Sequence, residues 1–382
     1  MLSGFPRAAA GVALMIVLAG CGSMVPTPTT AAPTATAVAT AAATTAPPVV
    51  VPSASAVVSA EVIVRSATGG FAVIPRQIHS PYFDAAFNGA QNAASQLGGT
   101  VSQAPAGGMQ PQRTFIQTAT VQGARAIIIA PDDPTADAPA MQAAMAAGVK
   151  VVAFDSSPAP GSYDVFVKPV DDVAMGETLA RMACDEAPKC SGEIAVLSAA
   201  KDATDQNAWI ATMRTALADS KYAGLKLDGI YYGDENGATA MGQTKAMLAA
   251  HPKLKVIVAL TIMAIAGAAQ VVTAQKKTGS VFVTGIGTPQ EMGGYVHSGV
   301  APEFAIWNVT DLGYLAYAVA VGLVTGQITG TVGEQFTVPY SLTLNGGEPY
   351  TIGAGNVVVL GSPLVFNAQN IDSYIIPNPF GF

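Results

Sequence analysis

Charged residues are scarce in this chain of 382 residues: they make up only 11% of it, and none occurs between Arg7 and Glu61. The net charge of −7 argues against nucleic acid as a partner, because nucleic-acid binding needs a basic surface. Histidine is also rare, with three residues at positions 79, 251 and 297. Their spacing indicates neither a zinc site nor a catalytic dyad. We therefore expect no metal and no cofactor.

The N-terminus has the pattern of an export signal. Arg7 supplies a short positive region, Ala8–Leu18 form an apolar run, and Leu18-Ala19-Gly20 precede Cys21 as in a lipobox. The run is shorter than the ~20 residues that a membrane-spanning helix needs, which disfavours the alternative of a membrane anchor. A mitochondrial-type leader is a second alternative. The pattern predicts a lipoprotein signal peptide over residues 1–20 and a lipid on Cys21, on the outer face of the cell membrane or in a periplasm.

A long segment without charge follows the predicted lipid site. Residues 21–60 consist almost only of Ala, Thr, Pro, Val and Ser, a composition that predicts a disordered stalk. The remaining chain is long enough for two domains. We expect an N-terminal lobe over 61–168 plus 307–337 and a C-terminal lobe over 169–306 plus 338–370. The apolar stretch Leu312–Gly326 is too short to span a membrane comfortably, and we expect a buried helix there.

The two cysteines beyond the signal lie close together. Cys184 and Cys190 flank the short segment "DEAPK". An oxidising compartment, as the export signal implies, favours a disulfide between them. No histidine or third cysteine lies nearby, so a metal site there is disfavoured. We expect a structural disulfide without a redox role.

Past Gly70 the chain alternates between short apolar runs and longer amphipathic stretches. The apolar runs are rich in Val and Ile, as in "ARAIIIAP", "VKVVAFD", "EIAVLSAA" and "LKVIVALT". Such alternation is typical of βαβ units, whose parallel sheets are buried on both faces. There are too many strands for one simple sheet. The sequence therefore predicts an α/β fold of two doubly wound parallel-sheet lobes joined by a hinge.

Ligands bind such sheets outside the carboxyl ends of the strands. Polar and aromatic side chains gather at these predicted ends, and aromatic faces beside bidentate hydrogen-bonding groups suit a sugar. The candidates are Arg76 with Gln77 and His79, Tyr82, Phe83, Asp132, Asp133, Asp155, Ser156, Asp205, Gln206, Thr261, Thr288 and Trp307.

Helix capping is the alternative role for several of these residues, because Asp, Ser and Thr are common N-caps. We assign Asp132 and Asp133, ahead of Pro134, mainly to capping. Arg76 offers only donors and is harder to explain as a cap. The stretch "TDQN", residues 204–207, has more polar groups than one cap needs. We expect one of them to cap and Asp205 with Gln206 to face the crevice.

Several blocks of the sequence together resemble a known family. "VIPRQIHSPYFDAAFNGAQNAASQLG", "TDQNAW", "VTGIGTPQEMGGYVHSG" and "FAIWNVTDLGYLA" are similar to the type I periplasmic sugar-binding proteins of ABC importers, in the branch that binds rhamnose or autoinducer-2. The resemblance covers roughly residues 70 to 370. It implies two lobes that close over a small ligand and deliver it to a membrane permease.

The resemblance also implies roles for single residues. Asp155 matches the strand-end aspartate that holds sugar hydroxyls, and Asp205 with Gln206 matches the paired contacts of the autoinducer-2 binders. Arg76 stands where those binders usually carry a lysine, which keeps the charge but changes its geometry. The remaining matches are the aromatic pair Tyr82 and Phe83, as in pentose binders, and Trp307 with Asn308, as in the rhamnose group.

One stretch departs from the autoinducer-2 pattern. Those binders typically show Ala-Pro-Asp-Ala-Asn where this chain has Ala259-Leu260-Thr261-Ile262-Met263. The proline and the acid are missing, and the change makes the pocket wall more apolar. Thr261 is nearer to the rhamnose pattern, and the apolar residues suit a 6-deoxy methyl group. The expected ligand is therefore a rhamnose-like sugar, with autoinducer-2 as the alternative.

Other functions fit less well. "SAAK" and "KTG" resemble pieces of a β-lactamase signature, but the Ser-Asp-Asn element is missing. "GIGTPQ" has Gln290 where a dinucleotide fingerprint needs its third glycine. A repressor of this fold would begin with a helix-turn-helix instead of an export signal. We expect a monomeric binding protein that is not an enzyme, although a receptor docking on a sensor kinase or chemoreceptor stays open.

Overall fold

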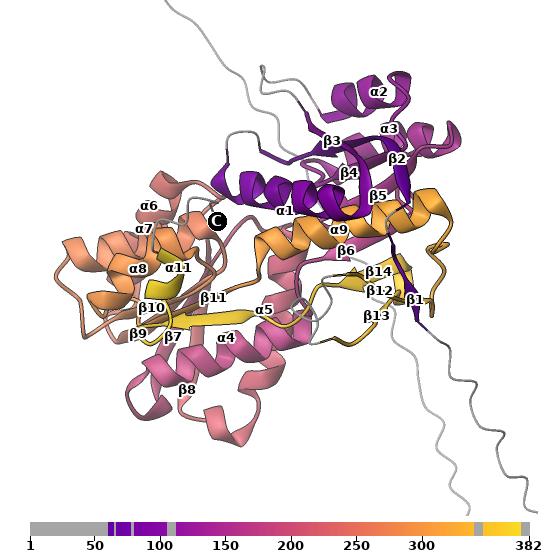
Figure 1. Ribbon diagram of the computed structural model, residues 1–382. Helices are drawn as coiled ribbons and strands as arrows, with labels where there is room; N and C mark the ends of the chain where they lie inside the picture. The colour runs from indigo at the N-terminus through magenta and orange to yellow at the C-terminus, as the bar shows by residue number, and fades with distance from the viewer. Residues whose placement is uncertain (1–59, 65, 78–79, 105–111, 340–346, 376–382) are drawn as a thin grey trace, which may run out of the picture. The chain divides into compact units, whose positions relative to one another are not determined.

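The computed structural model describes residues 60–64, 66–77, 80–104, 112–339 and 347–375, and Figure 1 shows how the elements are arranged. The predicted signal peptide, Cys21, nearly all of the predicted stalk and His79 lie outside these residues. The first half of the chain forms β1 (Glu61–Val62), β2 (Ala67–Ile74), α1 (Pro81–Leu97), β3 (Gly98–Gln103), α2 (Gln112–Val121), β4 (Ala126–Ile129), α3 (Pro134–Ala146), β5 (Lys150–Phe154), β6 (Val165–Lys168), α4 (Asp172–Glu186) and the short 3-10 turn η1 (Pro188–Cys190).

The second half continues the alternation and ends in short strands. Its elements are β7 (Gly192–Ser198), α5 (Thr204–Leu217), η2 (Ser220–Tyr222), β8 (Leu225–Tyr232), α6 (Gly237–Ala250), β9 (Leu254–Ala259), α7 (Ile262–Ala274), β10 (Phe282–Gly285), α8 (Pro289–His297), β11 (Glu303–Ile306), α9 (Val309–Thr325), β12 (Gln335–Thr337), β13 (Tyr350–Thr351), η3 (Ala354–Asn356), β14 (Val357–Val359), β15 (Leu364–Asn367) and α11 (Asp372–Ile375).

The larger sheet has the strand order β14-β6-β5-β4-β2-β3, and all its neighbouring strands run parallel. Helices cover both of its faces, and the side chains of β4 alternate between them. Ala126 and Ile128 join the core on the side of α1 and α9, whereas Ile127 and Ile129 join the cluster that includes Ile116 of α2. Burial on both faces explains why this strand reads as a continuous apolar run.

The smaller sheet has the order β10-β9-β7-β8, also parallel. Its strands contact α4, α6 and α7. The predicted fold of two doubly wound parallel-sheet lobes is confirmed. β8 lies at an edge, and its residues are mostly half-buried.

Short strands near the C-terminus correct the predicted lobe boundaries. β14 pairs with β6 of the larger sheet, although 338–370 was expected to belong wholly to the C-terminal lobe. β13 pairs with β12, which itself pairs with β1. β15 instead pairs antiparallel with β11. The chain thus returns to the larger sheet before β15, because parallel pairing with β6 completes an edge of that sheet.

The apolar stretch Leu312–Gly326 folds as predicted into a buried helix. It forms most of α9, in which every residue from 312 to 323 is buried. Within the described ranges, no helix is both long and apolar enough to cross a membrane. The structure also joins Cys184 of α4 to Cys190 of η1 by a disulfide.

Helices α1 and α9 lie side by side at very close range (Figure 1). A Cβ atom added at Gly89 of α1 would come 1.8 Å from the carbonyl oxygen of Thr310, and one added at Gly313 of α9 would come 1.8 Å from that of Ala86. Both obstructing atoms belong to backbones and cannot turn away. The missing side chains of these two glycines therefore set the spacing of the two helices.

Gly313→Ala is expected to destabilise the protein by about 1–3 kcal/mol or more, because overpacking forces two backbones apart. Gly294→Ala in α8 is the matched control. A Cβ there meets nothing within 4 Å, and alanine favours helix over glycine by about 0.5–1 kcal/mol. Urea unfolding of both variants measures the difference, and equal stabilities would contradict the proposed spacing role.

The buried Glu186 and the half-buried Glu303 join α4 to β11. The backbone N–H of Glu303 donates to Glu186 Oε1 at 3.1 Å, and Arg181 Nη2 pairs with Glu303 Oε2 at 3.3 Å. Burial, followed by repulsion from Glu303, raises the pKa of Glu186 to about 8. The folded protein thus favours the neutral form of Glu186 near neutral pH.

A raised folded pKa predicts a loss of stability with rising pH. The contribution of Glu186 is fully present below about pH 4.5, its ordinary pKa, and is lost as the pH rises through about 8. Glu186→Gln stays neutral and keeps an oxygen acceptor for the Glu303 N–H. Relative to the parent, it should gain on the order of 4 kcal/mol between pH 5 and pH 8.5, since a tenfold change in an acid dissociation constant corresponds to about 1.4 kcal/mol.

Urea unfolding at the two pH values tests this expectation. Glu177→Gln, at an exposed position on the same helix, is the control. If both variants show the same change in stability with pH, Glu186 is not the titrating group.

Candidate functional site

Two charged residues follow strands of the larger sheet at its carboxyl edge. Arg76 comes after β2, and Asp155 comes directly after β5 with a left-handed φ of 65°. Tyr82, in the first turn of α1, donates its hydroxyl hydrogen to Asp155 Oδ1. Ser156 Oγ donates to Asp155 Oδ2 at 3.2 Å. The backbone turn after β5 therefore places the Asp155 carboxylate at the carboxyl edge of the larger sheet.

Aromatic side chains extend this arrangement. Trp307, between β11 and α9, donates its Nε1 hydrogen to the Tyr82 hydroxyl at 2.7 Å. The two rings are nearly perpendicular, with centroids 6.4 Å apart. The ring centroids of Trp209, in α5, and Trp307 lie 6.0 Å apart. Trp209 Nε1 donates to Asp172 Oδ1 at 3.1 Å. Hydrogen bonds and ring contacts thus connect Asp155 to the smaller-sheet lobe.

Charge and burial act against each other in this cluster. Burial raises the pKa of Asp155, although the nearby Arg76 and the Tyr82 hydroxyl oppose the rise. Burial, and then the Asp155 charge, raise the pKa of Tyr82 well above its usual value, so this hydroxyl stays a donor. Burial alone would lower the pKa of Arg76, but Asp155 and Glu235 hold it above its usual value. Arg76 remains a cation.

The smaller-sheet lobe brings two acids to the same place. Asp205, in the first turn of α5, accepts a hydrogen bond of 2.7 Å from Ser157 Oγ. Glu235, in the turn after β8, pairs with Arg76 at 3.3 Å between Oε2 and Nη2. Ser157 and Arg76 both follow strands of the larger sheet. The carboxyl edges of the two sheets therefore face each other across polar contacts.

The comparisons with known proteins agree with this geometry. A family model described as a periplasmic binding protein domain matches residues 71–328. The chain belongs to the periplasmic binding protein family. The resemblance to type I periplasmic sugar-binding proteins of ABC importers, predicted from the sequence blocks, is confirmed.

Solved structures of similar proteins support the assignment. A sugar ABC transporter protein from Actinomyces odontolyticus is 36% identical, with a TM-score of 0.69, over 80% of this chain and 97% of that one. A solute-binding protein from Clostridium phytofermentas with bound L-rhamnose is 35% identical, with a TM-score of 0.73, over 81% and 99%. LsrB from Clostridium saccharobutylicum in complex with AI-2 is 22% identical, with a TM-score of 0.69, over 80% and 99%, a likeness that shows the fold alone.

Three of the predicted site residues serve the scaffold of this periplasmic binding protein. Phe83 is buried between Tyr82 and Phe154, with ring centroids 5.0 and 6.3 Å away. Thr261 caps α7 by accepting from Ala264 N at 3.1 Å. Asn308 caps α9 by accepting from Thr310 N at the same distance. Their contact with ligand stays a prediction, and their oxygens or rings already have structural partners.

The stretch "TDQN" does not cap its helix. The N-cap of α5 is Ala203, which has no side-chain cap, and Thr204 to Asn207 form the first turn. Asn207 Nδ2 donates back to the Lys201 carbonyl at 2.9 Å. Asp205 and Gln206 are half-buried. The Asp205 carboxylate therefore does not cap α5, and it contacts Ser157 of the larger-sheet lobe instead.

Sequence reasoning missed Glu235 and Ser157, which complete the polar contacts across the sheets. Glu235 and its neighbour Asp234 both have a left-handed φ of 49°. The strand-end rule that selected Asp155 could have selected Glu235, because acidic residues follow the apolar run "GIYYG". Ser157 lies two residues past Asp155 in "FDSS".

A cavity of about 370 Å³ lies beside these contacts. Its lining includes Ser157, Lys168 and Asp172. Asp172 also accepts from Trp209, and it forms an ion pair with Lys168. A second cavity, of about 390 Å³, is lined by residues such as Arg125 and Gln327 and shares no residue with the cluster. Of these two cavities, only the one lined by Ser157 adjoins the site.

Tyr82→Phe is expected to destabilise this periplasmic binding protein by about 1–3 kcal/mol, because it leaves the Trp307 N–H without its acceptor and Asp155 Oδ1 without its donor. Tyr232→Phe, at another half-buried tyrosine, is the control and should cost less. Urea unfolding followed by tryptophan fluorescence measures both. An equal loss of unfolding free energy in the two variants would contradict a stabilising role of the Tyr82 hydroxyl.

Proposed function

We propose that this protein captures a small, rhamnose-like sugar between its two lobes by hinge closure and delivers it to the permease of an ABC importer. The observation that carries the proposal is the cluster of Arg76, Tyr82, Asp155 and Trp307, which meets Asp205 from the opposite lobe. Carboxylates and a guanidinium can bridge vicinal hydroxyls, and aromatic faces can stack on the C–H face of a sugar ring.

The present contacts indicate how a ligand would be held. Arg76 Nε is buried and has no hydrogen-bond partner among the described residues. Buried donors are normally satisfied, so an oxygen of a ligand is a fitting partner for this group. Ser157 donates a hydrogen bond to Asp205, and Glu235 contacts the two outer nitrogens of Arg76. A sugar hydroxyl would exchange with these contacts when it binds.

The connections between the sheets support hinge closure. The chain passes between β6 and α4 within residues 168–172, and between β11 and α9 within residues 306–309. A third connection runs from β14 to β15. Few residues need to change conformation in such a hinge, and ligand contacts from both lobes favour the closed form. No bond of the ligand is made or broken in this mechanism.

The rhamnose-like ligand is favoured by two observations. The relative from Clostridium phytofermentas, 35% identical, was solved with bound L-rhamnose. The first turn of α7, which follows β9, carries the half-buried Ile262 and the exposed Met263, and both suit a 6-deoxy methyl group. Autoinducer-2 uptake or signalling is the second candidate, because Asp205 and Gln206 match the positions of the paired ligand contacts in the autoinducer-2 binders that the sequence resembles.

The proposed setting is the outer face of the cell membrane. A lipid on Cys21 would tether the protein there, and residues 21–60 would act as a stalk that lets the lobes reach the permease. We propose that the protein acts as a monomer. A receptor that docks on a sensor kinase or chemoreceptor would use the same site, and isolation of the bound membrane partner distinguishes the two roles.

Titration of the full chain in detergent micelles tests the function. Rhamnose, other hexoses and pentoses, and autoinducer-2 are added while the fluorescence of Trp209 and Trp307 is followed, and calorimetry checks each response. Saturable binding of rhamnose is expected. Asp155→Ala and Asp205→Ala should each weaken it by about 2–5 kcal/mol, because buried polar partners are left unpaired.

Asp219→Ala is the matched control, since Asp219 is exposed and caps only the short turn η2. It should bind as the parent does. Binding of autoinducer-2 but no sugar would favour the second candidate. Unchanged affinity in both the Asp155 and the Asp205 variant would disprove the site. If the folded protein binds none of the added sugars and no autoinducer-2, the proposed ligand class is wrong.

A further inference from the structure

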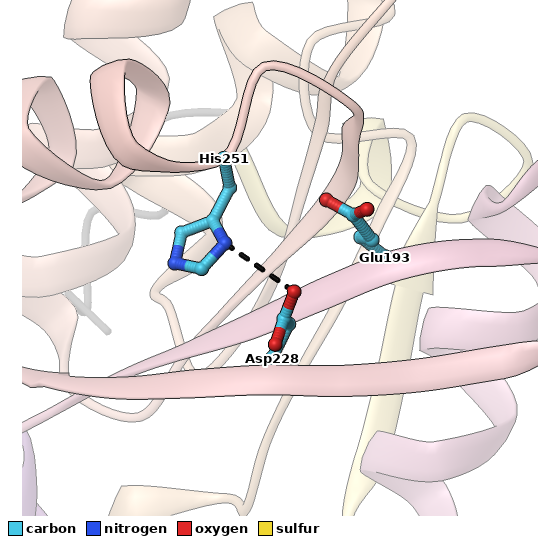
Figure 2. A group of neighbouring side chains, drawn as sticks. All are labelled: Glu193, Asp228 and His251. Atoms are coloured by element: carbon cyan, nitrogen blue, oxygen red, sulfur yellow. Dashed lines mark ion pairs between the residues drawn. The ribbon is translucent and has the colours of Figure 1, made fainter.

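We propose that the smaller-sheet lobe holds a divalent transition-metal ion between Glu193, Asp228 and His251. Figure 2 shows the three side chains directed toward one another. One ligand atom of each lies within 4.8 Å of the others. All three residues are half-buried. The proposal does not depend on the identity of the sugar or on the proposed function.

The fold explains why these distant residues meet. Glu193 lies at the start of β7, Asp228 lies in the neighbouring β8, and His251 caps the end of α6. In the register of the two strands, Glu193 of β7 lies opposite Lys226 of β8. Asp228 follows Lys226 by two residues, so its side chain lies on the same face of the sheet as that of Glu193. The register of β7 and β8 then shifts between Ile194 and Val196.

Gly229, beside Asp228, leaves room for the Tyr231 ring, whose hydroxyl contacts His251. Its φ is 146°, and a Cβ there would lie 3.1 Å from the Tyr231 ring and 3.6 Å from His251 Nε2. A bulge of this kind re-aims the neighbouring side chain. The irregularity of the strand therefore places a carboxylate and an imidazole face to face.

The hydrogen bonding of His251 leaves one ring nitrogen for a metal. Nε2 lies 2.9 Å from the Tyr231 hydroxyl, a contact that fixes the ring orientation. Metal-bound histidines usually hold their second nitrogen in this way. Nδ1 then faces Asp228 Oδ2 at 3.5 Å (Figure 2). When His251 is neutral and Nε2 carries the hydrogen, the Nδ1 lone pair points into the cluster.

The separation of these two atoms suits a tetrahedral metal. Ligand atoms about 2.1 Å from a tetrahedral zinc ion lie about 3.4 Å apart, a spacing longer than a good hydrogen bond. The distance from Nδ1 to Asp228 Oδ2 is close to this value. Glu193 needs a side-chain shift on the order of 1 Å to reach the same separation, and water can fill a fourth position.

The charges fit a divalent cation. Two carboxylates and a neutral imidazole balance a charge of +2, and one nitrogen with two oxygens suits zinc and its first-row neighbours. Glu193 has no ion pair or hydrogen bond of its side chain within the described part of the chain. Lys226 is the competitor, with Nζ 3.2 Å from Asp228 Oδ2, but its side chain is 69% exposed and can swing into solvent.

Zinc binding by the full, tag-free chain in detergent micelles tests the proposal. Calorimetry is expected to show one zinc ion per chain, and bound zinc should raise the Tm of the protein. Glu193→Gln and His251→Asn should each weaken binding roughly ten-fold or more. The visible spectrum of bound Co²⁺ should change in both variants.

His297→Ala is the matched control, because His297 pairs with a single carboxylate, Asp372, at 2.9 Å on the surface. It should leave zinc binding unchanged. Absence of binding to the folded parent would overturn the proposal, as would a loss in His297→Ala with Glu193→Gln unaffected. Glu193→Gln alone keeps the test decisive if His251→Asn fails to fold, since it leaves the Tyr231–His251 contact in place.

Discussion

The close approach of α1 and α9 is the contact on which the candidate site depends. Gly89 and Gly313 let each backbone touch the other, as no larger residue could. Tyr82 stands in the first turn of α1, and Trp307 stands just before α9. The distance between the two helices therefore sets the hydrogen bond of 2.7 Å between Trp307 and Tyr82, and through it the position of Asp155.

A chain with so few charges concentrates them where the two sheets face each other. Arg76 and Asp155 from the larger-sheet lobe meet Asp205 and Glu235 from the smaller one. Burial raises the cost of each charge, but each has an opposite charge or a donor close by. The same balance fails to hold for Glu186, because the carboxylate of Glu303 adds repulsion to burial. Partners therefore offset burial for the charges of the cluster, whereas a like charge adds to burial at Glu186.

Period and composition were enough to predict the alternating fold, the buried helix around Leu312 and the strand ends that carry Arg76 and Asp155. They could not predict that β14 returns to the larger sheet, because three residues carry too little pattern to choose between two sheets. They also could not separate Thr261 and Asn308, which cap helices, from Asp205, which does not. Capping depends on a hydrogen bond to a backbone N–H, and residue type alone does not determine it.

Strand polarity separates the two proposed sites of the smaller-sheet lobe. β7 begins next to Glu193 and ends at Ser198, after which the chain turns toward Asp205. Sugar contacts at the carboxyl end must change as the lobes close. Metal ligands near the amino end join β7, β8 and the end of α6 inside one lobe. An ion bound there would stabilise the half-buried edge strand β8 without opposing the hinge, because no ligand of the metal crosses between the lobes.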